Sequence, residues 1–470
     1  MSMFDFEFED SDDSTDSTRL RGLVETFETQ GDTAYFDSDT LEDIASFYFE
    51  EGRLEEALTV VDRLVEMYPF SSDGWMRRGI LLNNLGRHEE ALTAYDHALA
   101  LNPVDSETII NRGITLDSLD RGDEALQDYD RVIEINPFND EALFNRGVAL
   151  ERMNRLTDAI AAFEFCSEQN PDHLEVWYEL GYCHDRLGND ERSISCYDRH
   201  LETDPYSHDA WYNRGIVLNR CGHFKEAVES YDMAILISDT FASAHYNRGN
   251  ALANLNRLPE AIESYGHVIE LEGGDAATCY NIALAYEELR NFDQAIAHFQ
   301  RALEADEGYA EAWYGLGCCL EALERHEEAM VNFNRAIVLS PETPEYWYAK
   351  ADCAYNMGRI DEAMTAYRTV VRVAPKNHEA WMDYAETLFE AHHVKDALDA
   401  YREALNLNPK CAGTYFNQAK ALFALGKPEE SIRSLKTAFG LDPRKKDEFQ
   451  QSYPDLYRDA RIRRMLDLDG

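Results

Sequence analysis

Positive charge is scarce in this sequence, and lysine is the rarer of its two basic side chains. The chain of 470 residues has 90 Asp and Glu against 44 Lys and Arg, which gives a formal net charge of −46. Only 10 of the basic residues are Lys, and the first of these is Lys225. Nucleic-acid binding and attraction to anionic membranes both need basic residues, so we expect neither kind of partner.

Long apolar runs and targeting signals are also missing. No apolar run approaches the ~18 residues that a membrane span needs. The N-terminal stretch MSMFDFEFEDSDDSTDS is acidic and lacks the basic flank and apolar core of a signal peptide. We therefore expect a cytoplasmic protein. The nine cysteines include no CxxC pair, which favours reduced thiols in small apolar sites.

Motifs of catalysis are absent as well. The sequence has no Gly-rich phosphate loop, no HExxH and no nucleophile elbow. His392 and His393 are adjacent, and adjacent side chains do not share a helix face. We therefore expect no enzyme activity, no cofactor and no metal.

The acidity has two interpretations. It resembles the composition of proteins from salt-accumulating halophiles, in which surface carboxylates maintain solubility and salt screens their repulsion. The alternative is a groove whose acidic side chains attract a basic ligand.

A repeat of 34 residues organises the chain. Counted from residue 38 as position 1, twelve units follow without a slip through residue 445. Position 8 is Gly or Ala, position 20 is Ala or Ser, position 24 is aromatic in ten units, and position 32 is Pro in nine. All six tryptophans stand at position 4: Trp75, Trp177, Trp211, Trp313, Trp347 and Trp381.

These positions resemble the tetratricopeptide repeat (TPR), and the chain is identified as a long bacterial member of that family. The resemblance implies an all-α, right-handed superhelical solenoid of twelve hairpins, each with a first helix (helix A) and a second helix (helix B). The apolar spacing and the Gly-containing break in each unit agree with this fold. They predict helices near 72–85 and 90–102 and at every 34-residue step.

The two ends of the array need caps, since each repeat covers only its neighbours. We predict an acidic disordered tail over 1–17, a capping helix over 18–37, twelve repeats over 38–445, and capping helices over 446–470. Leu23 and Phe27 fall where positions 20 and 24 of an earlier repeat would lie.

The C-terminal cap is predicted to cover repeat twelve with apolar side chains. These are Phe449, Tyr453, Leu456, Ile462 and Leu466. Its basic residues, Arg461, Arg463 and Arg464, form either a solvated face or a docking site for an acidic partner.

Position 7 carries Arg in five repeats. Sixteen residues earlier, at position 25 of the preceding repeat, all five have Asp, and the six other junctions have none. We therefore predict ion pairs from helix B of one repeat to helix A of the next. They are Asp62–Arg78, Asp96–Arg112, Asp130–Arg146, Asp198–Arg214 and Asp232–Arg248. The rival pairing, between positions 7 and 25 of one repeat, offers Asp in only three of five.

Two further rows suggest a binding face. Position 6 has Asn in several repeats, namely Asn111, Asn145, Asn213, Asn247 and Asn281. Position 5 is aromatic in seven successive repeats: Phe144, Tyr178, Tyr212, Tyr246, Tyr280, Tyr314 and Tyr348. In the family, helix A lines the concave face, and such an Asn row holds the backbone of an extended peptide. Family consensus is the other reading of the Asn row, and helix packing is the other reading of the aromatic row.

Acidic residues accompany these rows. Position 2 carries Glu107, Glu141, Glu175, Asp209, Glu311, Glu345 and Glu379. The resemblance therefore implies a negative groove, which excludes the family's Lys- and Arg-lined clamp for chaperone carboxylates.

The sequence predicts a non-catalytic scaffold that binds a protein or peptide in this acidic groove, whose charge favours a basic partner. A structural or assembly subunit that acts through its ends or convex face is the alternative. A regulatory subunit of an enzyme is a more remote one. The oligomeric state does not follow from the sequence.

Overall fold

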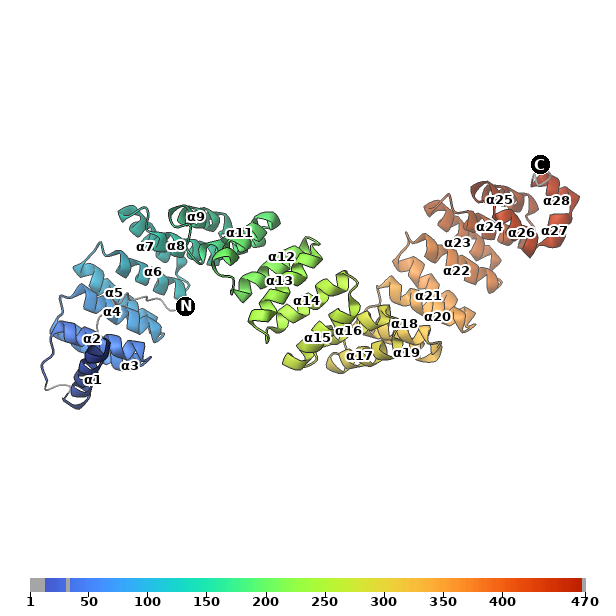
Figure 1. Cartoon of the computed structure of the whole chain (residues 1–470). Coiled ribbons are helices and arrows are strands. Elements are labelled where there is room, and N and C mark those ends of the chain that lie inside the picture. Colours follow the sequence, from blue (N-terminus) through green and yellow to red (C-terminus); the bar gives the residue numbers. More distant parts are fainter. Residues whose placement is uncertain (1–12, 31–33, 467–470) are drawn as a thin grey trace. The chain divides into compact units, whose positions relative to one another are not determined.

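The computed structural model describes residues 13–30 and 34–466 (Figure 1). These residues form 28 helices and no strand, which confirms the predicted all-α repeat fold. No described helix combines the length and the apolar character needed to cross a membrane. The chain divides into two compact units, Met1–Ile237 and Ser238–Gly470, and each is described by itself.

The first unit contains a leading helix and six hairpins. Its helices are α1 (Asp13–Gln30), α2 (Ser38–Glu50), α3 (Leu54–Met67), α4 (Ser72–Asn84), α5 (His88–Leu101), α6 (Ser106–Ser118), α7 (Gly122–Ile135), α8 (Asp140–Arg152), α9 (Leu156–Gln169), α10 (Val176–Arg186), α11 (Asp190–Thr203), α12 (His208–Arg220) and α13 (Phe224–Ile237). Each even-numbered helix is the helix A of one repeat, and the next odd-numbered helix is its helix B.

The second unit contains six more hairpins and three short C-terminal helices. Its hairpin helices are α14 (Ala242–Asn254), α15 (Leu258–Glu272), α16 (Ala276–Glu288), α17 (Phe292–Ala305), α18 (Ala310–Ala322), α19 (His326–Leu339), α20 (Pro344–Asn356), α21 (Ile360–Val373), α22 (His378–Glu390), α23 (Val394–Leu407), α24 (Ala412–Ala424) and α25 (Pro428–Leu441). The last three are α26 (Lys445–Ser452), α27 (Pro454–Arg458) and α28 (Ala460–Met465).

The turn between helices A and B has the same backbone in every repeat. Position 15 has a positive φ, between 57° and 79°, in all twelve repeats. Six of these residues are Gly, which adopts this left-handed conformation without strain, and six are not. The repeat therefore imposes the turn even where its residue is Arg290, Glu324 or His392.

The start of helix A is fixed by a capping side chain in many repeats. Position 34 of the preceding repeat accepts a hydrogen bond from the backbone three residues on, as Ser71 does from Gly74 at 3.1 Å. The same bond is made by Asp105, Asn139, Ser207, Asp275 and Asn377.

Close packing holds the two helices of a hairpin together. A Cβ added to Gly79 at position 8 would lie 2.4 Å from the ring of Tyr95 at position 24, so the ring occupies the space that a side chain would need.

The six tryptophans stabilise the junctions between repeats. Each indole Nε1 donates to the backbone carbonyl six residues earlier at 2.8–3.1 Å.

The N-terminal cap differs in extent from the prediction. Helix α1 begins at Asp13, so it takes in the last residues of the predicted disordered tail, and the rest of that tail lies outside the described residues. Serine and aspartate in a first helical turn are favoured by the free N–H groups and the helix dipole there. Leu23 and Phe27 pack on the first hairpin, together with the buried Val24.

The C-terminal helices cover repeat twelve. Phe449 and Leu466 are buried, and Tyr453, Leu456 and Ile462 pack against the same cluster. The helix around Phe449 starts at Lys445, one residue before the predicted start of the C-terminal cap at 446.

Four of the predicted Asp–Arg pairs have contact geometry between neighbouring repeats. The Arg nitrogen lies 2.7 Å from the Asp oxygen in Asp62–Arg78, Asp96–Arg112 and Asp130–Arg146, and 2.6 Å in Asp198–Arg214. The fifth pair, Asp232–Arg248, stays a prediction.

Three of the five position-7 arginines also reach position 23 of their own repeat, which the sequence analysis did not foresee. Arg112 makes two bonds to Asp128, Nε to Oδ2 at 2.8 Å and Nη2 to Oδ1 at 2.5 Å. Arg214 and Arg248 donate to Ser230 and Ser264, both at 2.6 Å. Arg112 and Arg214 thus tie helix A both to its own helix B and to the preceding one, whereas Arg78 and Arg146, which have Ala94 and Ala162 at position 23, bond the preceding helix B.

Candidate binding face on the first helices of the repeats

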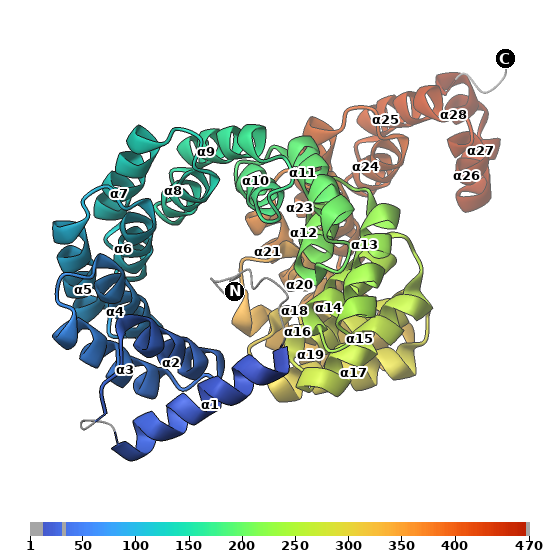
Figure 2. The same cartoon turned by 60° about the vertical axis from the view of Figure 1, so that its left-hand side comes forward.

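The helix A side of the first unit faces the inside of an arc. Figure 2 shows α6, α8 and α10 on the inner side of this unit and α7, α9 and α11 on its outer side. The resemblance to the family implies that positions 2, 5, 6, 9, 12 and 13 of helix A line the concave surface or its edge.

Side chains of helix A line a hollow in repeats one to three. Its walls come from the predicted inward positions, including Ser46, Phe49, Asp73, Met76, Arg77, Ile80 and Glu107. Arg77, which stands at the position of the Asn row, bonds Asp73 at 2.9 Å and lies 3.8 Å from Glu42. Burial raises the pKa of Glu42.

The aromatic row at position 5 is half-buried and packs inside its own repeats. Each of the seven rings lies against the position-24 ring of the same hairpin, with centroids 5.7–6.1 Å apart. This is the helix-packing role that the sequence analysis weighed against recognition. The bodies of the rings are therefore structural.

Two Tyr hydroxyls of the aromatic row accept hydrogen bonds from residues of the Asn row. Asn213 Nδ2 donates to the Tyr178 hydroxyl at 2.9 Å, and Asn281 Nδ2 donates to the Tyr246 hydroxyl at 3.0 Å. In both pairs the partners are 35 residues apart, from position 5 of one repeat to position 6 of the next. Tyr348 makes the equivalent bond to the Asp383 carboxylate.

Other members of the Asn row have different surroundings. Asn111 is buried, and Asn145 donates to the backbone carbonyl of Glu141 in its own helix at 2.9 Å. Asn417, which occupies position 6 of repeat twelve, donates to the Glu386 carboxylate. The row is thus a set of inter-repeat and local contacts, and its action on a partner stays a prediction.

A second set of contacts links position 12 to position 13 of the next repeat. Arg220 Nη2 lies 2.6 Å from Asp185, Asn356 donates to Glu321 at 3.0 Å, and Tyr355 donates to Glu390 at 2.8 Å. These contacts and the Tyr–Asn pairs were missed in the sequence. The position-12 contacts use a different pair of residue types at each of these junctions, so no recurring pair marks them in the sequence.

Carboxyl groups on helix A have raised pKa values. Burial, with repulsion from neighbouring acids, raises the pKa of Glu107 and of Glu141, although both residues are exposed to solvent. In the second unit, burial likewise raises the pKa of Glu287, Asp383 and Glu386. Groups that are accessible to solvent yet surrounded by protein are expected in a hollow rather than on a flat surface.

Among these helix A carboxyls, the most strongly raised pKa is found between repeats four and five. Burial, followed by a hydrogen bond with the Glu151 carboxyl and by its charge, raises the pKa of Glu179 to about 8. Two carboxyl groups that share one site hold a proton between them, so the pair titrates as a unit. A cation placed beside this pair would favour its ionised form.

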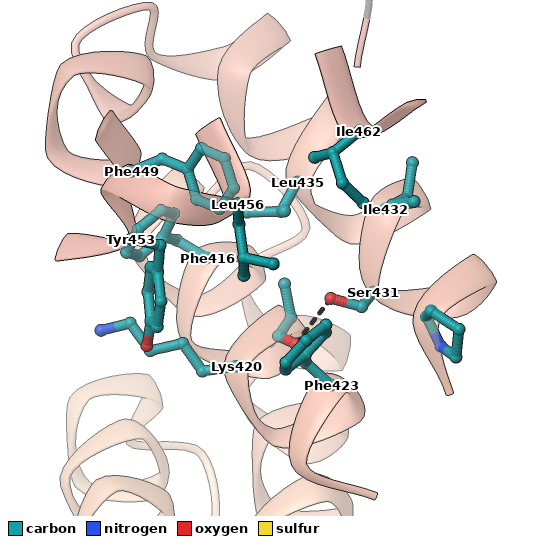
Figure 3. A pocket seen from close by; sticks show the side chains of 12 residues that line it. Phe416, Lys420, Phe423, Ser431, Ile432, Leu435, Phe449, Tyr453, Leu456 and Ile462 are labelled. Atoms are coloured by element: carbon teal, nitrogen blue, oxygen red, sulfur yellow. Dashed lines mark hydrogen bonds between the residues drawn. The ribbon is translucent and has the colours of Figure 1, made fainter. Parts of the chain in front are cut away.

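A different hollow lies under the C-terminal cap. Figure 3 shows Phe449, Leu456 and Ile462 of the cap facing Phe416, Ile432 and Leu435 of repeat twelve. Ser431 Oγ donates to the Ala419 carbonyl at 2.8 Å inside it. Its lining is mostly the apolar interface between cap and repeat, so it belongs to the capping contact.

The family comparison agrees with the repeat geometry. One tetratricopeptide repeat model matches residues 43–106, 110–164, 152–208, 280–345, 331–368 and 348–413, and another matches 242–275 and 412–445. The first model alone covers more than half of the chain. The chain therefore belongs to the tetratricopeptide repeat family, as predicted. No curated protein matches it.

Several solved structures are similar to parts of the chain. MamA (residues 41 to the end) from Desulfovibrio magneticus RS-1 is 20% identical over 36% of this chain and 95% of its own, with a TM-score of 0.35. The C-terminal part of a TPR protein from Cytophaga hutchinsonii is 17% identical over 51% and 99%, with a TM-score of 0.46. YrrB, described as a TPR protein with an unusual peptide-binding site, is 19% identical over 39% and 95%, with a TM-score of 0.35. No residue role is carried over from them.

Proposed function

We propose that this chain is a non-catalytic interaction scaffold whose helix A face binds an extended, basic segment of a partner protein. Membership of the family supports a protein partner. The observation that carries the basic character is the set of helix A carboxyls whose pKa values are raised. A raised carboxyl pKa means that neighbouring positive charge does not compensate for burial.

A basic partner would supply that missing charge. Its Arg or Lys side chains would favour the ionised form of Glu107, Glu141 and the Glu151–Glu179 pair, so binding and ionisation would support each other. An acidic partner would meet repulsion along the whole face. Charge complementarity of this kind sets specificity and association rate more than it sets affinity.

The Tyr–Asn contacts would keep the face ready for binding. A side chain that is already held in place loses little conformational freedom when a partner arrives. An amide has two N–H donors and an acceptor oxygen, so an Asn that holds a Tyr hydroxyl can also bond one peptide unit. Asn213 and Asn281 would then serve both the junction and the partner.

The test uses a fluorescent, extended peptide in which arginine alternates with small polar residues. Its affinity is measured by anisotropy for the wild type and for the variant Glu107→Gln, Glu141→Gln and Glu175→Gln. If each lost charge costs about 0.5 kcal/mol, the peptide should bind about tenfold more weakly.

The matched control removes the same charge from helix B. Glu66, Glu134 and Glu168 stand at position 29 of three hairpins of the first unit and are exposed. Their change to Gln should leave the affinity almost unaltered. An equal loss in both variants would mean that the general acidity of the chain attracts the peptide, and the proposed face would be wrong.

A further inference from the structure

Three metal-ligating side chains meet at the junction of repeats nine and ten. Glu321 lies near the end of α18, His326 begins α19, and Cys353 lies in α20. Their ligand atoms all lie within 4.8 Å of one another, and no other group of three His, Cys, Asp or Glu in the described part of the chain does so. His326 Nδ1 is 2.8 Å from Glu321 Oε2, and Cys353 Sγ is 3.4 Å from the His326 carbonyl.

The repeat fold itself brings these positions together. In repeats two and three the same positions hold Asn83, His88 and Thr115. There His88 Nδ1 lies 2.8 Å from Asn83 Oδ1, and the Thr115 hydroxyl donates to the same oxygen at 3.1 Å. That junction is a hydrogen-bonded network with an amide and a hydroxyl. At the junction of repeats nine and ten a carboxylate and a thiol replace them, so all three groups can bind a metal ion.

Other junctions carry only part of the set. Glu287 and Cys319 occupy the carboxylate and thiol positions one repeat earlier, but Phe292 stands where the histidine would be. Glu151 and Cys183 are accompanied by Leu156 in the same way. These incomplete junctions are internal controls for the complete one.

The donor atoms select a class of ion. A thiolate, an imidazole and a carboxylate together are ligands for zinc and similar divalent transition metals, whereas magnesium and calcium prefer oxygen alone. Zinc bonds of about 2.0–2.3 Å would require the three groups to close in around the ion by small side-chain movements.

The surroundings also fit a metal site. Asn356 donates to Glu321 Oε1 at 3.0 Å and would hold the carboxylate in orientation once its other oxygen binds an ion. The side chains of Glu321 and His326 are 23% and 29% exposed, while Cys353 is fully buried. An ion could therefore enter from the solvent side and meet the sulfur beneath.

We propose that Glu321, His326 and Cys353 bind one zinc-class divalent ion that ties α18 and α19 of repeat nine to α20 of repeat ten. On binding, the thiol gives its proton to solvent and the neutral imidazole keeps one of its own. The three ligands leave a fourth position for water or for a side chain of a partner. Because the ion binds only the folded junction, it raises the thermal stability of the chain.

Cobalt(II) is the probe, because a thiolate bound to it gives a sulfur-to-metal charge-transfer band that carboxylates alone cannot produce. Titration of the reduced full chain in chelator-free buffer should give this band, saturating at one ion per chain, and zinc should displace the cobalt. The absence of the band in the wild type would overturn the proposal.

The substitutions are chosen by comparison with other junctions of the same chain. Cys353→Thr should abolish the band and weaken binding by at least about tenfold, the loss typical of a single supporting contact. Cys319→Thr should leave both unchanged. The double variant Glu321→Asn, Cys353→Thr copies the junction of repeats two and three, so it should fold with normal helicity and bind no cobalt. A band that survives in Cys353→Thr would place the thiolate elsewhere and refute the assignment.

The reverse exchange tests whether the three positions suffice. Asn83→Glu with Thr115→Cys, together with the natural His88, should add a second cobalt ion per chain with the same band. A stoichiometry that stays at one would contradict the claim that this junction geometry builds the site.

Discussion

Arg112 bonds two aspartates whose exposures are very different. The side chain of Asp96, in the preceding repeat, is 64% exposed, whereas that of Asp128, in the same repeat, is 5% exposed. The attraction to Asp96 is weakened by solvent, while the two bonds to Asp128 satisfy a charge that water hardly reaches. One arginine therefore joins two helices with unequal strength.

Removal of the two carboxylates should separate these contributions. Asp128→Ala leaves Arg112 partly buried without its bidentate partner and should lower the free energy of unfolding by about 3 kcal/mol. Asp96→Ala should lower it by less than about 1 kcal/mol. Urea denaturation followed by circular dichroism compares them, and equal losses would show that exposure does not rank the two contacts.

Because of the Glu151–Glu179 pair, the stability of the fold should depend on pH with a sign opposite to that given by an ordinary salt bridge. The pKa of Glu179 is raised from 4.5 to about 8, so the folded state binds a proton more tightly than the unfolded chain does. The free energy of unfolding should therefore fall as the pH rises between these values, by at most about 1.4 kcal/mol per pH unit.

Glu179→Gln keeps the shape of the side chain and removes this titration. Its melting temperature should match the wild type near about pH 5 and exceed it near about pH 8.5, where the wild-type pair is ionised. Glu168→Gln, which removes an exposed carboxylate from α9, is the control. If both variants follow the same pH curve, the carboxyl pair does not affect stability.

At the scale of the helix, α15 carries two glycines with opposite roles. Gly273 caps its end with φ 86° and ψ 170°, a conformation that only glycine adopts readily. Gly266 lies in the helical interior, where an added Cβ would meet nothing within 4 Å.

Alanine at these two sites should change stability in opposite directions. Gly273→Ala should destabilise the fold by about 1–3 kcal/mol because of backbone strain. Gly266→Ala should stabilise it by about 0.5–1 kcal/mol because alanine favours the helix. Thermal unfolding of the two variants checks the signs, and a shift in the same direction for both would contradict the assignment of the cap.

At the scale of the whole molecule, the middle junctions lack the proline that ends most repeats. Position 32 is Asp239, Gly273 and Glu307 in three successive repeats, and the boundary between the two units falls at 237–238. Proline reduces the number of backbone conformations that the unfolded turn can adopt, and glycine increases it. We therefore expect local opening to start within 237–276.

Hydrogen exchange read by mass spectrometry tests this expectation. Peptides from 237–276 should exchange faster than those of repeats two to four, which lie between residues 72 and 173. A variant with Glu307→Pro, which restores the common residue one repeat later, serves as a comparison. Equal protection of the middle and of repeats two to four would rule out the weak junction.

The fold could be predicted well from the sequence because the same contact recurs at many junctions. Each junction can therefore be compared with the others within one chain. The Asp–Arg pairs emerged from five such observations. The second partner of Arg112 did not, because position 23 varies between Asp128, Ser230 and Ala94 and shows no single residue type. The left-handed conformation of the turn was also not predicted for every repeat, because Arg290 and Glu324 adopt it at positions where no Gly indicates it.

The candidate binding face was harder to predict, because one side chain can serve two roles. Tyr178 was expected either to recognise a partner or to pack, and its ring packs on Tyr197 while its hydroxyl accepts a bond from Asn213. Charge alone could not distinguish a groove from a generally acidic surface. The burial that raises the pKa of Glu107 depends on neighbouring helices, so it became visible only in three dimensions.

The division of each Asp–Arg pair between two repeats has a consequence for how such an array can grow. A repeat that carries both residues, such as repeat three with Arg112 and Asp130, presents an aspartate at one end and an arginine at the other. A tandem duplication of that repeat would pair with its own template at once and need no second mutation. Duplication of repeat five would instead set Asp198 against a copy of Leu180, so the ancestry of the array should favour units that already complement themselves.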